Sequence, residues 1–469
     1  MVCSNILFLV IDGFRSDSCF GPNKNSKTPN LDSIIKLGSA FPNASGPAFT
    51  TTPSMSSVLT SMYPHECLIE DNGTHDLNPN LKTYVSHLSD LNYNTYAFLP
   101  EVMNTSRISK LFGKNIKTYS SNSTISTGND KEFLEHFKKI KTQEPWFFYL
   151  HLYDLYVTFV SEYDKSDFLE DEKLGKNKYE RILSNLDLFF GKLFNEIDFK
   201  NTILVIVADH GNDRGAYDKN IDDFVSNLRE AKNPIFAKKE LINKLTPNFL
   251  KPLKYKLGKK YLSNLKKNIV KNEIKKISEE NLSIHEKRLI NSAISGETHL
   301  FDDRFHIPMI LIAPQLNKQN KIKDQISTID IFPTIFDIIE HPEYNINSRG
   351  KTLLPLINEK DTHTSYAFID SIANSPKQNL SDLIGIRTLE YKYCRNRNDK
   401  TKSVYLYNLE KDPLEEINIA QENPNLIEKF ENTLNEINPS MNFNVKTLNI
   451  KTDKESEKVK KILRDLGYI

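Results

Sequence analysis

The sequence is short of cysteine. Its 469 residues include four cysteines, and no two of them lie close enough along the chain to form a C-x-x-C pair. This spacing excludes a zinc ribbon or a dithiol redox motif, and it predicts free thiols in a reducing compartment. The four residues are Cys3, Cys19, Cys67 and Cys394.

Long apolar segments are also missing. The run Ile6–Ile11 has no basic segment before it and stops at Asp12, so it is too short for the apolar core of a secretory signal. No other stretch approaches the roughly 18 apolar residues of a membrane-spanning helix. We therefore expect a soluble, cytoplasmic protein.

The chain carries no excess of one charge. Lysine and arginine total 62 and aspartate and glutamate total 61, so the formal net charge is 62 − 61 = +1. This balance excludes a uniformly basic nucleic-acid binder and an acidic solvating tail. We accordingly expect no nucleic-acid partner.

The balance conceals one strongly basic segment. Residues 232–276 contain 14 lysines and two acids, a net charge of 14 − 2 = +12, so the other 424 residues carry 1 − 12 = −11. Apolar residues recur in this segment at mostly helical spacing, which indicates a basic amphipathic insertion. Three roles are consistent with this pattern. The insertion could be a solvated helical segment covering the sheet, a lid beside the active site, or a peripheral contact with an anionic membrane or polymer.

Short, uninterrupted apolar runs predict the fold. Such runs are typical of strands covered on both faces, and helical stretches lie between them, which together predict an α/β fold with a doubly wound, mainly parallel sheet. Ligands of such sheets bind at the carboxyl ends of strands, and three of the four runs lead to an aspartate there. The runs are Ile6–Ile11 before Asp12, Trp146–Leu150 before Asp154, Ile203–Ala208 before Asp209, and Pro308–Ala313.

Helices are predicted where apolar residues recur every three to four positions. The four clearest segments are Thr83–Leu91, Lys178–Phe194, Ile331–Glu340 and Asn425–Ile437. The C-terminal region differs, because two apolar segments joined by the polar stretch Asn396–Lys402 predict a β-hairpin. These segments are Ile384–Tyr393 and Ser403–Leu409.

The strand-end side chains suit a metal ion. Asp12 follows the first run, and Asp209 and His210 follow another. Carboxylate oxygens together with one imidazole are what a divalent ion needs. A single aspartate at a strand end is usually a helix cap, so it is the pair of strand ends that favours a metal site.

A threonine- and serine-rich segment follows the first strand. Pro53 suits the first position of a helix with Thr52 as its N-cap, and the helix N-terminus would offer N–H groups and a positive dipole end to an anion. Thr51 would lie at the mouth of that site. A bound metal could activate its hydroxyl as a nucleophile, whereas the alternative is an ordinary helix cap without chemistry.

Six segments in order resemble the sulfatase branch of the alkaline phosphatase superfamily. They include the first strand, a counterpart of the C/S-x-P-S-R nucleophile motif, an Asp-His-Gly strand end and an L-Y-D-L-x-x-D-P-like hairpin. Together they cover residues 5 to about 420, except for the basic insertion. The segments are Asn5–Asp12, Thr51–Pro64, Asp209–Gly211, Phe301–Ile310, Ile329–Thr334 and Tyr405–Pro413.

This sequence departs from the family pattern at positions of the nucleophile, metal and sulfate-binding motifs. Family sulfatases convert a cysteine or serine into formylglycine, but Thr51 stands at that position and its secondary alcohol cannot give an aldehyde. Met55 replaces the motif's arginine, and Gly13 replaces the second aspartate of an Asp-Asp pair. The family's Gly-Lys element is represented by Ala97–Leu99, and Tyr156 replaces the histidine of its D-P-H motif.

A threonine nucleophile is typical of the superfamily's phosphodiesterases, phosphonate hydrolases and phosphoglycerol transferases. The resemblance therefore implies that Thr51 forms a covalent intermediate with a phosphate ester, within a metal shell of Asp12, Thr51, Asp209 and His210. It further implies Asp154 and His299 as ligands of a second metal or of the substrate. His306 lies at the position of a family arginine, and His65 and Asn72 are weaker candidates for the site lining.

The resemblance also implies the domain organisation and the cofactor. It predicts a catalytic domain over residues 1–375 with an insertion at about 213–297, and a hairpin-containing C-terminal subdomain with a helical tail over residues 376–469. One or two divalent ions are expected, with Mn²⁺ or Zn²⁺ suiting three oxygens and one nitrogen better than Ca²⁺. Two alternatives to a phosphate-ester enzyme stay open: a sulfate-ester hydrolase that works without formylglycine, and a binding protein that has lost catalysis.

Overall fold

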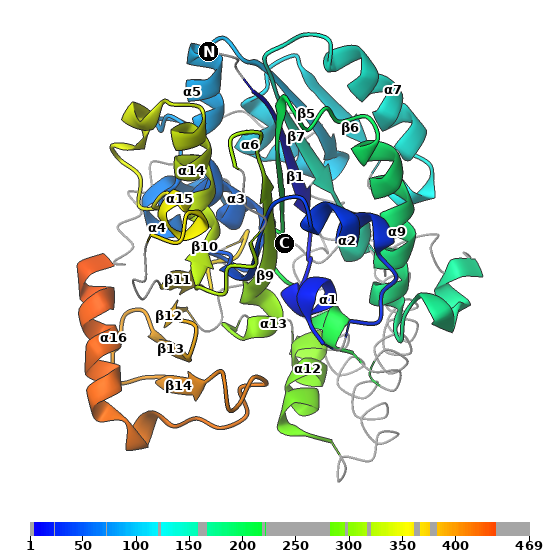
Figure 1. Cartoon of the computed structure of the whole chain (residues 1–469). Coiled ribbons are helices and arrows are strands. Elements are labelled where there is room, and N and C mark those ends of the chain that lie inside the picture. The colour runs from blue at the N-terminus through cyan, green and yellow to red at the C-terminus, as the bar shows by residue number, and fades with distance from the viewer. Residues whose placement is uncertain are drawn as a thin grey trace, which may run out of the picture. The chain divides into compact units, whose positions relative to one another are not determined.

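The computed structural model describes residues 4–437 apart from several gaps (Figure 1). The chain divides into two compact units, residues 1–215 with 298–469, and residues 216–297, whose range overlaps the predicted insertion. The basic segment 232–276 and Asn72 lie outside the described residues, so the predicted membrane or polymer contact stays a prediction. The gaps are residues 23, 72, 121–122, 158–166, 218–220, 222–281, 296–298, 317–319, 361–365 and 376–381.

An eight-stranded sheet forms the centre of the first unit. Its strand order is β10-β2-β9-β8-β1-β7-β5-β6, and every neighbouring pair is parallel except those made by β9. This architecture confirms the predicted α/β fold with a mainly parallel sheet. The strands are β1 Asn5–Ile11, β2 Ser39–Ser45, β5 Asn94–Pro100, β6 Ile116–Tyr119, β7 Trp146–Leu152, β8 Thr202–Val207, β9 His306–Ile312 and β10 Ile326–Ser327. A separate two-stranded sheet pairs β3 Leu68–Asp71 with β4 Thr74–Leu77.

Helices cover both faces of this sheet. Figure 1 shows α3, α5 and α14 on one side and α2, α7 and α9 on the other. Phe8 of β1 packs against Phe332 of α14, whereas Phe148 of β7 packs edge-on against Phe133 of α7. Burial on both faces explains why the strand sequences are apolar throughout rather than alternating.

Helix boundaries follow the predicted segments closely. The four predicted helices correspond to α5 Tyr84–Asp90, α9 Lys178–Phe194, α14 Ile331–Ile338 and α16 Pro424–Ile437. The other α-helices among the described residues are α1 Ser16–Phe20, α2 Pro29–Ile35, α3 Thr51–Thr60, α4 Pro64–Cys67, α6 Arg107–Lys110, α7 Asp130–Ile140, α8 Asp154–Val157, α12 Ile284–Ser295, α13 Asp302–Phe305 and α15 Leu354–Ile357. No helix among the described residues is long and apolar enough to cross a membrane.

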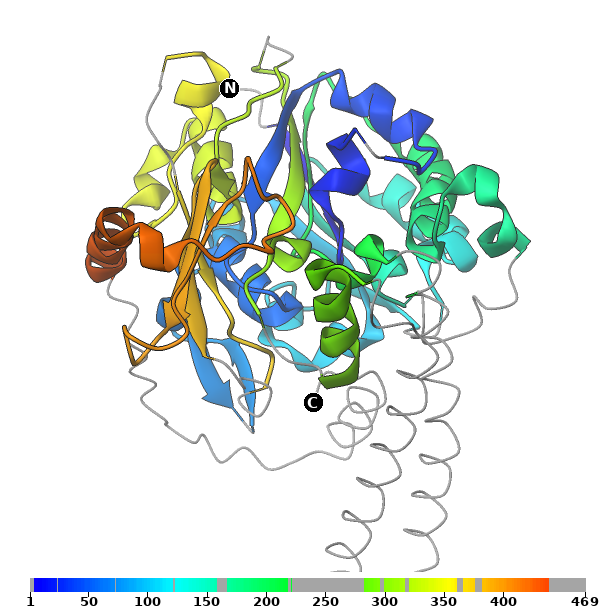
Figure 2. The same ribbon diagram turned by 90° about the horizontal axis from the view of Figure 1, so that it is seen from below.

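A four-stranded antiparallel sheet forms the C-terminal part, and Figure 2 shows α16 running beside it. The segment predicted as one strand, Ile384–Tyr393, is in fact two strands that turn at Leu389 and Glu390, where Tyr391 N–H donates to Thr388 Oγ1. Apolar residues alternate at Ile384 and Ile386 and again at Leu389, Tyr391 and Tyr393, so the alternation shifts by one residue at this turn. The prediction of a single strand overlooked that shift. The stretch Asn396–Lys402 joins the last two strands, as predicted. The strands are β11 Ala367–Asp370, β12 Leu383–Arg387, β13 Tyr391–Asn396 and β14 Tyr405–Asn408.

Buried charges join this sheet to the segment before β9. Lys392 is 0% exposed, and its Nζ lies 2.5 Å from Asp302, 2.6 Å from Glu415 and 2.9 Å from the carbonyl oxygen of Leu300. Burial alone would lower the pKa of Lys392, but the two carboxylates raise it above its usual range. The lysine is therefore charged and fully paired inside the protein.

We expect Lys392→Met to destabilise the protein by about 3–5 kcal/mol, because Asp302 and Glu415 would lose a buried partner. Denaturant unfolding of the full chain measures the change. Lys400→Met is the matched control: its exposed ammonium pairs with Glu431, and its loss should cost no more than about 0.5 kcal/mol. Equal stability of the two variants would contradict this role for the buried cluster.

The described cysteines are free thiols. Cys19, Cys67 and Cys394 are all buried and unpaired with one another. Burial raises the pKa of each thiol, to about 12 for Cys67. The absence of a disulfide among these three agrees with the prediction from their spacing, whereas Cys3 lies outside the described residues.

Candidate active site

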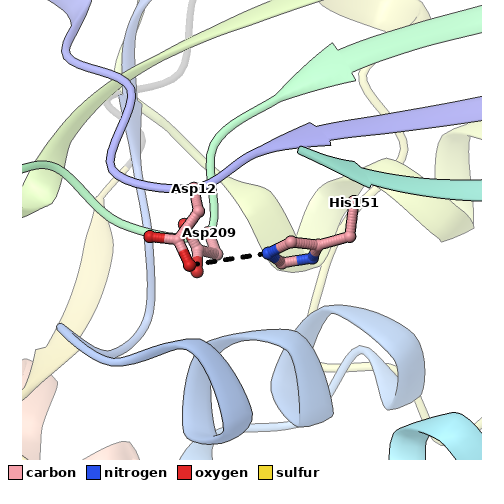
Figure 3. A group of neighbouring side chains, drawn as sticks. All are labelled: Asp12, His151 and Asp209. Atoms are coloured by element: carbon pink, nitrogen blue, oxygen red, sulfur yellow. Dashed lines mark ion pairs between the residues drawn. The ribbon is translucent and has the colours of Figure 1, made fainter. Parts of the chain in front are cut away.

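Three neighbouring strands bring their polar side chains to one point. β1 lies between β7 and β8, and Asp12, directly after β1, donates its N–H to the carbonyl oxygen of Leu152 at 2.9 Å. Asp12, His151 and Asp209 converge there, all 0% exposed, and one ligand atom from each lies within 4.8 Å of the others (Figure 3). This group is the centre of the candidate site.

Neither imidazole forms a hydrogen bond with the facing carboxylates. His151 Nε2 lies 3.6 Å from Asp12 Oδ2, and His210 Nε2 lies 3.8 Å from Asp12 Oδ1 and 3.4 Å from Asp209 Oδ2. Three buried atoms, Asp12 Oδ1, His151 Nε2 and Asp209 Oδ2, have no hydrogen-bond partner among the described residues. Ligands about 2.0–2.2 Å from a shared ion lie roughly 3–4 Å apart, so these atoms fit a divalent metal ion.

Hydrogen bonds orient the side chains around the group. Asp209 Oδ1 accepts the N–H groups of Gly13 at 3.2 Å and His210 at 2.8 Å, which leaves Oδ2 free. His210 Nδ1 donates to the carbonyl oxygen of Gly211 at 2.8 Å, so its Nε2 carries the lone pair. His151 Nδ1 is hydrogen-bonded to the Tyr149 hydroxyl at 3.0 Å. Such outer partners fix the orientation of metal-binding side chains.

Gly13 is required by the turn that follows β1. Its φ is +72°, and a Cβ atom at this position would lie 3.1 Å from the side chain of Asn212. A glycine adopts this left-handed conformation without strain. The turn directs the Gly13 N–H at Asp209 Oδ1.

The electrostatics of the group favour a cation. Burial and the neighbouring carboxylate of Asp209 raise the pKa of Asp12 above its usual range. Two buried carboxylates side by side repel each other when both are charged. A divalent cation between them would offset both the repulsion and the desolvation, so the carboxylates would be ionised with the metal bound.

Thr51 lies at this group. Its Oγ1 donates to Asp12 Oδ2 at 3.2 Å, and Ser54 Oγ, one turn along α3, donates to the carbonyl oxygen of Asp209 at 2.6 Å. Helix α3 begins at Thr51 with Thr50 as N-cap, so the predicted cap at Thr52 was wrong. Thr51 is consequently held in the first turn of a helix that is hydrogen-bonded to the end of β8.

The helix N-terminus offers less to an anion than we predicted. Thr52 N–H donates to Asn374 Oδ1 at 3.3 Å, and Ser54 N–H donates to the carbonyl oxygen of Thr50 at 3.1 Å. Pro53 has no N–H. These three positions therefore contribute the helix dipole rather than free donors.

The residues predicted to bind a second metal or the substrate have other partners in the structure. Asp154 Oδ1 accepts the N–H of Ser126 at 2.9 Å and its hydroxyl at 2.5 Å, and Oδ2 accepts the N–H of Ile125 at 3.4 Å. His299 Nε2 lies 3.6 Å from Asp213, which also pairs with Arg304 at 2.8 Å. Neither Asp154 nor His299 belongs to the metal-capable group found among the described residues.

The remaining candidates from the sequence have structural contacts. His306 Nε2 is hydrogen-bonded to the carbonyl oxygen of Pro42 at 2.7 Å. Burial of the imidazole and, to a smaller extent, the positive charge of Arg387 lower the pKa of His306 to about 4. The ring of His65 stacks on Tyr63 with centroids 5.8 Å apart. Neither contact involves the metal-capable group.

Arg15, near Asp12 in the sequence, is fully occupied. It forms two hydrogen bonds to Asp17, at 2.9 and 2.6 Å, and its Nη1 lies 3.0 Å from Asp303. Nη1 also donates to the carbonyl oxygen of Asn212 at 3.2 Å. This arginine ties together the loops after β1 and β8 and the start of α13.

The sequence prediction of the site does not include His151. This residue lies between the apolar run Trp146–Leu150 and Asp154. The available signal was a single imidazole near the end of a strand that is otherwise apolar and fully buried. Its importance depends on β7 being the direct neighbour of β1, with Val10 paired to His151, which the sequence does not show.

A model of the sulfatase family matches residues 4–341. The chain belongs to the sulfatase family. A second model, described as the C-terminal part of N-sulphoglucosamine sulphohydrolase, matches residues 296–440. The resemblance inferred from the six motifs is thereby confirmed, and with it the assignment to an enzyme family of the alkaline phosphatase superfamily.

Curated sulfatase relatives match a limited part of the chain. Arylsulfatase K of Gallus gallus is 26% identical over 147 residues, which are 29% of this chain and 26% of that protein. Arylsulfatase K of Danio rerio is 27% identical over 141 residues, 29% of this chain and 27% of that protein. The matched part thus spans about a quarter of the length of these relatives.

Solved structures match over nearly the whole chain. A Bacteroides thetaiotaomicron structure described under glycosaminoglycan metabolism has a TM-score of 0.61 at 16% identity, covering 94% of this chain and 100% of that one. The phosphonate monoester hydrolase of Agrobacterium radiobacter has a TM-score of 0.60 at 13% identity, covering 93% and 95%. At these identities the likeness confirms the sulfatase-type fold alone.

Proposed function

We propose that this sulfatase-family chain is a metal-dependent hydrolase of sulfate esters. One observation supports the proposal most directly: Thr51 Oγ1 donates a hydrogen bond to Asp12. Asp12 belongs to the buried Asp12–His151–Asp209 group, which fits a divalent ion. The relatives named arylsulfatase K and the sulphohydrolase name of the C-terminal family model support a sulfate ester as the substrate.

The nucleophile in this proposal is Thr51. Its Oγ1 attacks the sulfur of the ester, the bond between sulfur and the ester oxygen breaks, and the proton lost by the Thr51 hydroxyl ends on the oxygen of the leaving alcohol. Water then attacks the sulfur of the threonine sulfate, which releases sulfate and restores the hydroxyl. Asp12 Oδ2 accepts the hydrogen bond of the hydroxyl and orients it.

The remaining residues of the group hold the site in place. Asp12, Asp209, His151 and His210 would hold the divalent ion, which when bound lowers the pKa of a hydroxyl and stabilises developing negative charge. Ser54 fixes α3 to the end of β8, so that Thr51 keeps its position. Burial of the group excludes bulk water from the attacking oxygen.

A second candidate is the hydrolysis or transfer of a phosphate ester. The specific observation in its favour is Thr51 itself, which cannot become formylglycine and would form a phosphothreonine that water or a sugar hydroxyl resolves. The similarity to the fold of a phosphonate monoester hydrolase supports it only in part. The names of the relatives favour the sulfate ester over this first prediction from the sequence.

Matched substrates separate the two candidates. We expect the purified, metal-loaded chain to show a higher kcat/KM for an aryl sulfate than for the corresponding aryl phosphodiester and phosphonate monoester. The reverse order would favour the phosphate-ester enzyme. If the protein binds no stoichiometric divalent ion and turns over none of these esters, the binding-protein alternative is correct.

A further inference from the structure

We propose that His151 is a metal ligand and that, together with His210, it makes the centre selective for a transition-metal ion such as Zn²⁺ over Ca²⁺. The proposal deepens the proposed function by naming the class of ion. It also enlarges the shell implied by the family resemblance, which did not include His151. It rests on the geometry of the buried group rather than on the substrate.

The position of His151 suits a ligand better than a salt-bridge partner. An imidazolium paired with a carboxylate would approach it to about 2.7–2.9 Å, whereas Nε2 of His151 lies 3.6 Å from Asp12 Oδ2. Nε2 is completely buried and has no hydrogen-bond partner among the described residues. A buried polar atom without a partner needs an explanation, and a cation shared with the carboxylates supplies one.

Tyr149 determines which nitrogen faces the group. The Tyr149 hydroxyl lies 3.0 Å from Nδ1 of His151, and it is itself fully buried on the same strand. When Nδ1–H donates to this oxygen, the lone pair of Nε2 points toward Asp12 and Asp209. His210 has the same arrangement, with Nδ1–H donating to the carbonyl oxygen of Gly211. In this tautomer both imidazoles present an unprotonated Nε2.

The group has too few oxygens for Ca²⁺, which takes six to eight. Asp209 Oδ1 is used by two N–H groups, so Asp209 offers one oxygen, and Thr51 offers another. Asp12 contributes at most two. Gly13 supplies no side chain, and Asn212 Oδ1 accepts the N–H of Arg214. Two imidazoles with two carboxylates are instead a donor set that suits Zn²⁺ and related ions.

The first test uses the unmodified full-length chain. After removal of metal by chelation, we expect Zn²⁺ to bind with one ion per chain and at least about 100-fold more tightly than Ca²⁺, measured by calorimetry. X-ray absorption spectroscopy of the Zn²⁺-loaded protein should then count two imidazole ligands. One imidazole, or tighter binding of Ca²⁺, would overturn the proposal.

The second test removes the Nε2 ligand of His151 by shortening the side chain. His151→Asn retains a polar atom near Tyr149, and we expect it to lose at least about 100-fold in Zn²⁺ affinity, whereas Tyr149→Phe should lose about tenfold. His136→Asn, on α7 and outside the group, is the matched control and should bind as the wild type does. Unchanged Zn²⁺ affinity in a folded His151→Asn would overturn the proposal. If this variant does not fold, the number of imidazole ligands that X-ray absorption spectroscopy counts in the wild type tests the proposal instead.

These readouts need no substrate, so they are independent of the ester specificity. A chain that binds Zn²⁺ through two imidazoles but cleaves no sulfate ester would overturn the proposed function and leave this inference standing. A chain that cleaves sulfate esters with a Ca²⁺ ion and one imidazole would do the opposite.

Discussion

Thr51→Ala is expected to reduce kcat for ester hydrolysis by at least about 10⁴-fold, because the covalent step loses its attacking oxygen. The variant should remain folded, since the helix contact from Ser54 to Asp209 and the cap position at Thr50 are unchanged. Its metal affinity should fall only modestly, because the other side chains of the group remain. Steady-state kinetics with the preferred ester, together with metal analysis, measures both effects.

Thr52→Ala is the matched control for this experiment. Thr52 is adjacent in the same helical turn, and its described contact is made by the backbone N–H rather than by the side chain. We expect its kcat to stay within a factor of a few of the wild type. Comparable losses in the two variants would indicate disruption of the helix start, and full activity of Thr51→Ala would exclude Thr51 as the nucleophile.

Asp209→Asn is expected to remove both the metal and the activity. The amide retains an oxygen for the N–H groups of Gly13 and His210, but the buried Oδ2 that faces Asp12 is no longer part of a carboxylate. We expect metal occupancy to fall from about one ion per chain to near zero, and turnover to fall at least about 10³-fold. Chelation of the wild type should have the same effect and be reversed by added metal.

Asp187→Asn serves as the control for a buried carboxylate. Asp187 lies on α9 and is almost completely buried, but it accepts backbone N–H groups from Asn30 and Leu31, on α2, rather than facing the metal-capable group. It should retain full metal occupancy. Stoichiometric metal in Asp209→Asn would contradict the assignment of the site, and so would wild-type turnover in fully chelated protein.

The fold was largely predictable because local and long-range signals agree. Lys178–Phe194 is a helix as predicted, with apolar residues at helical spacing and an N-cap side chain, Asn177, that accepts the N–H of Glu180. The uninterrupted apolar strands indicated a sheet covered on both faces. Asp12 and Asp209 could be paired from the sequence alone, because carboxyl ends of parallel strands lie at one edge of a sheet.

The remaining features depend on contacts that a single sequence does not specify. His151 joins the group because β7 is next to β1, and strand order arises from packing of the whole sheet. Asp154 follows the same strand, yet its carboxylate accepts hydrogen bonds from Ile125 and Ser126, which a strand-end rule cannot distinguish from metal binding. Helix α3 likewise starts at Thr51 rather than Pro53, a boundary that the position of the proline does not determine.

In the proposed mechanism, Thr51 carries the transferred group. The most direct measurement is mass spectrometry of the Thr51 peptide after the metal-loaded enzyme is quenched by denaturation during turnover of saturating sulfate ester. We expect a sulfate group on Thr51 in the wild type and none in Thr51→Ala. Rapid turnover with Thr51 unmodified and a sulfate group on another residue would contradict it.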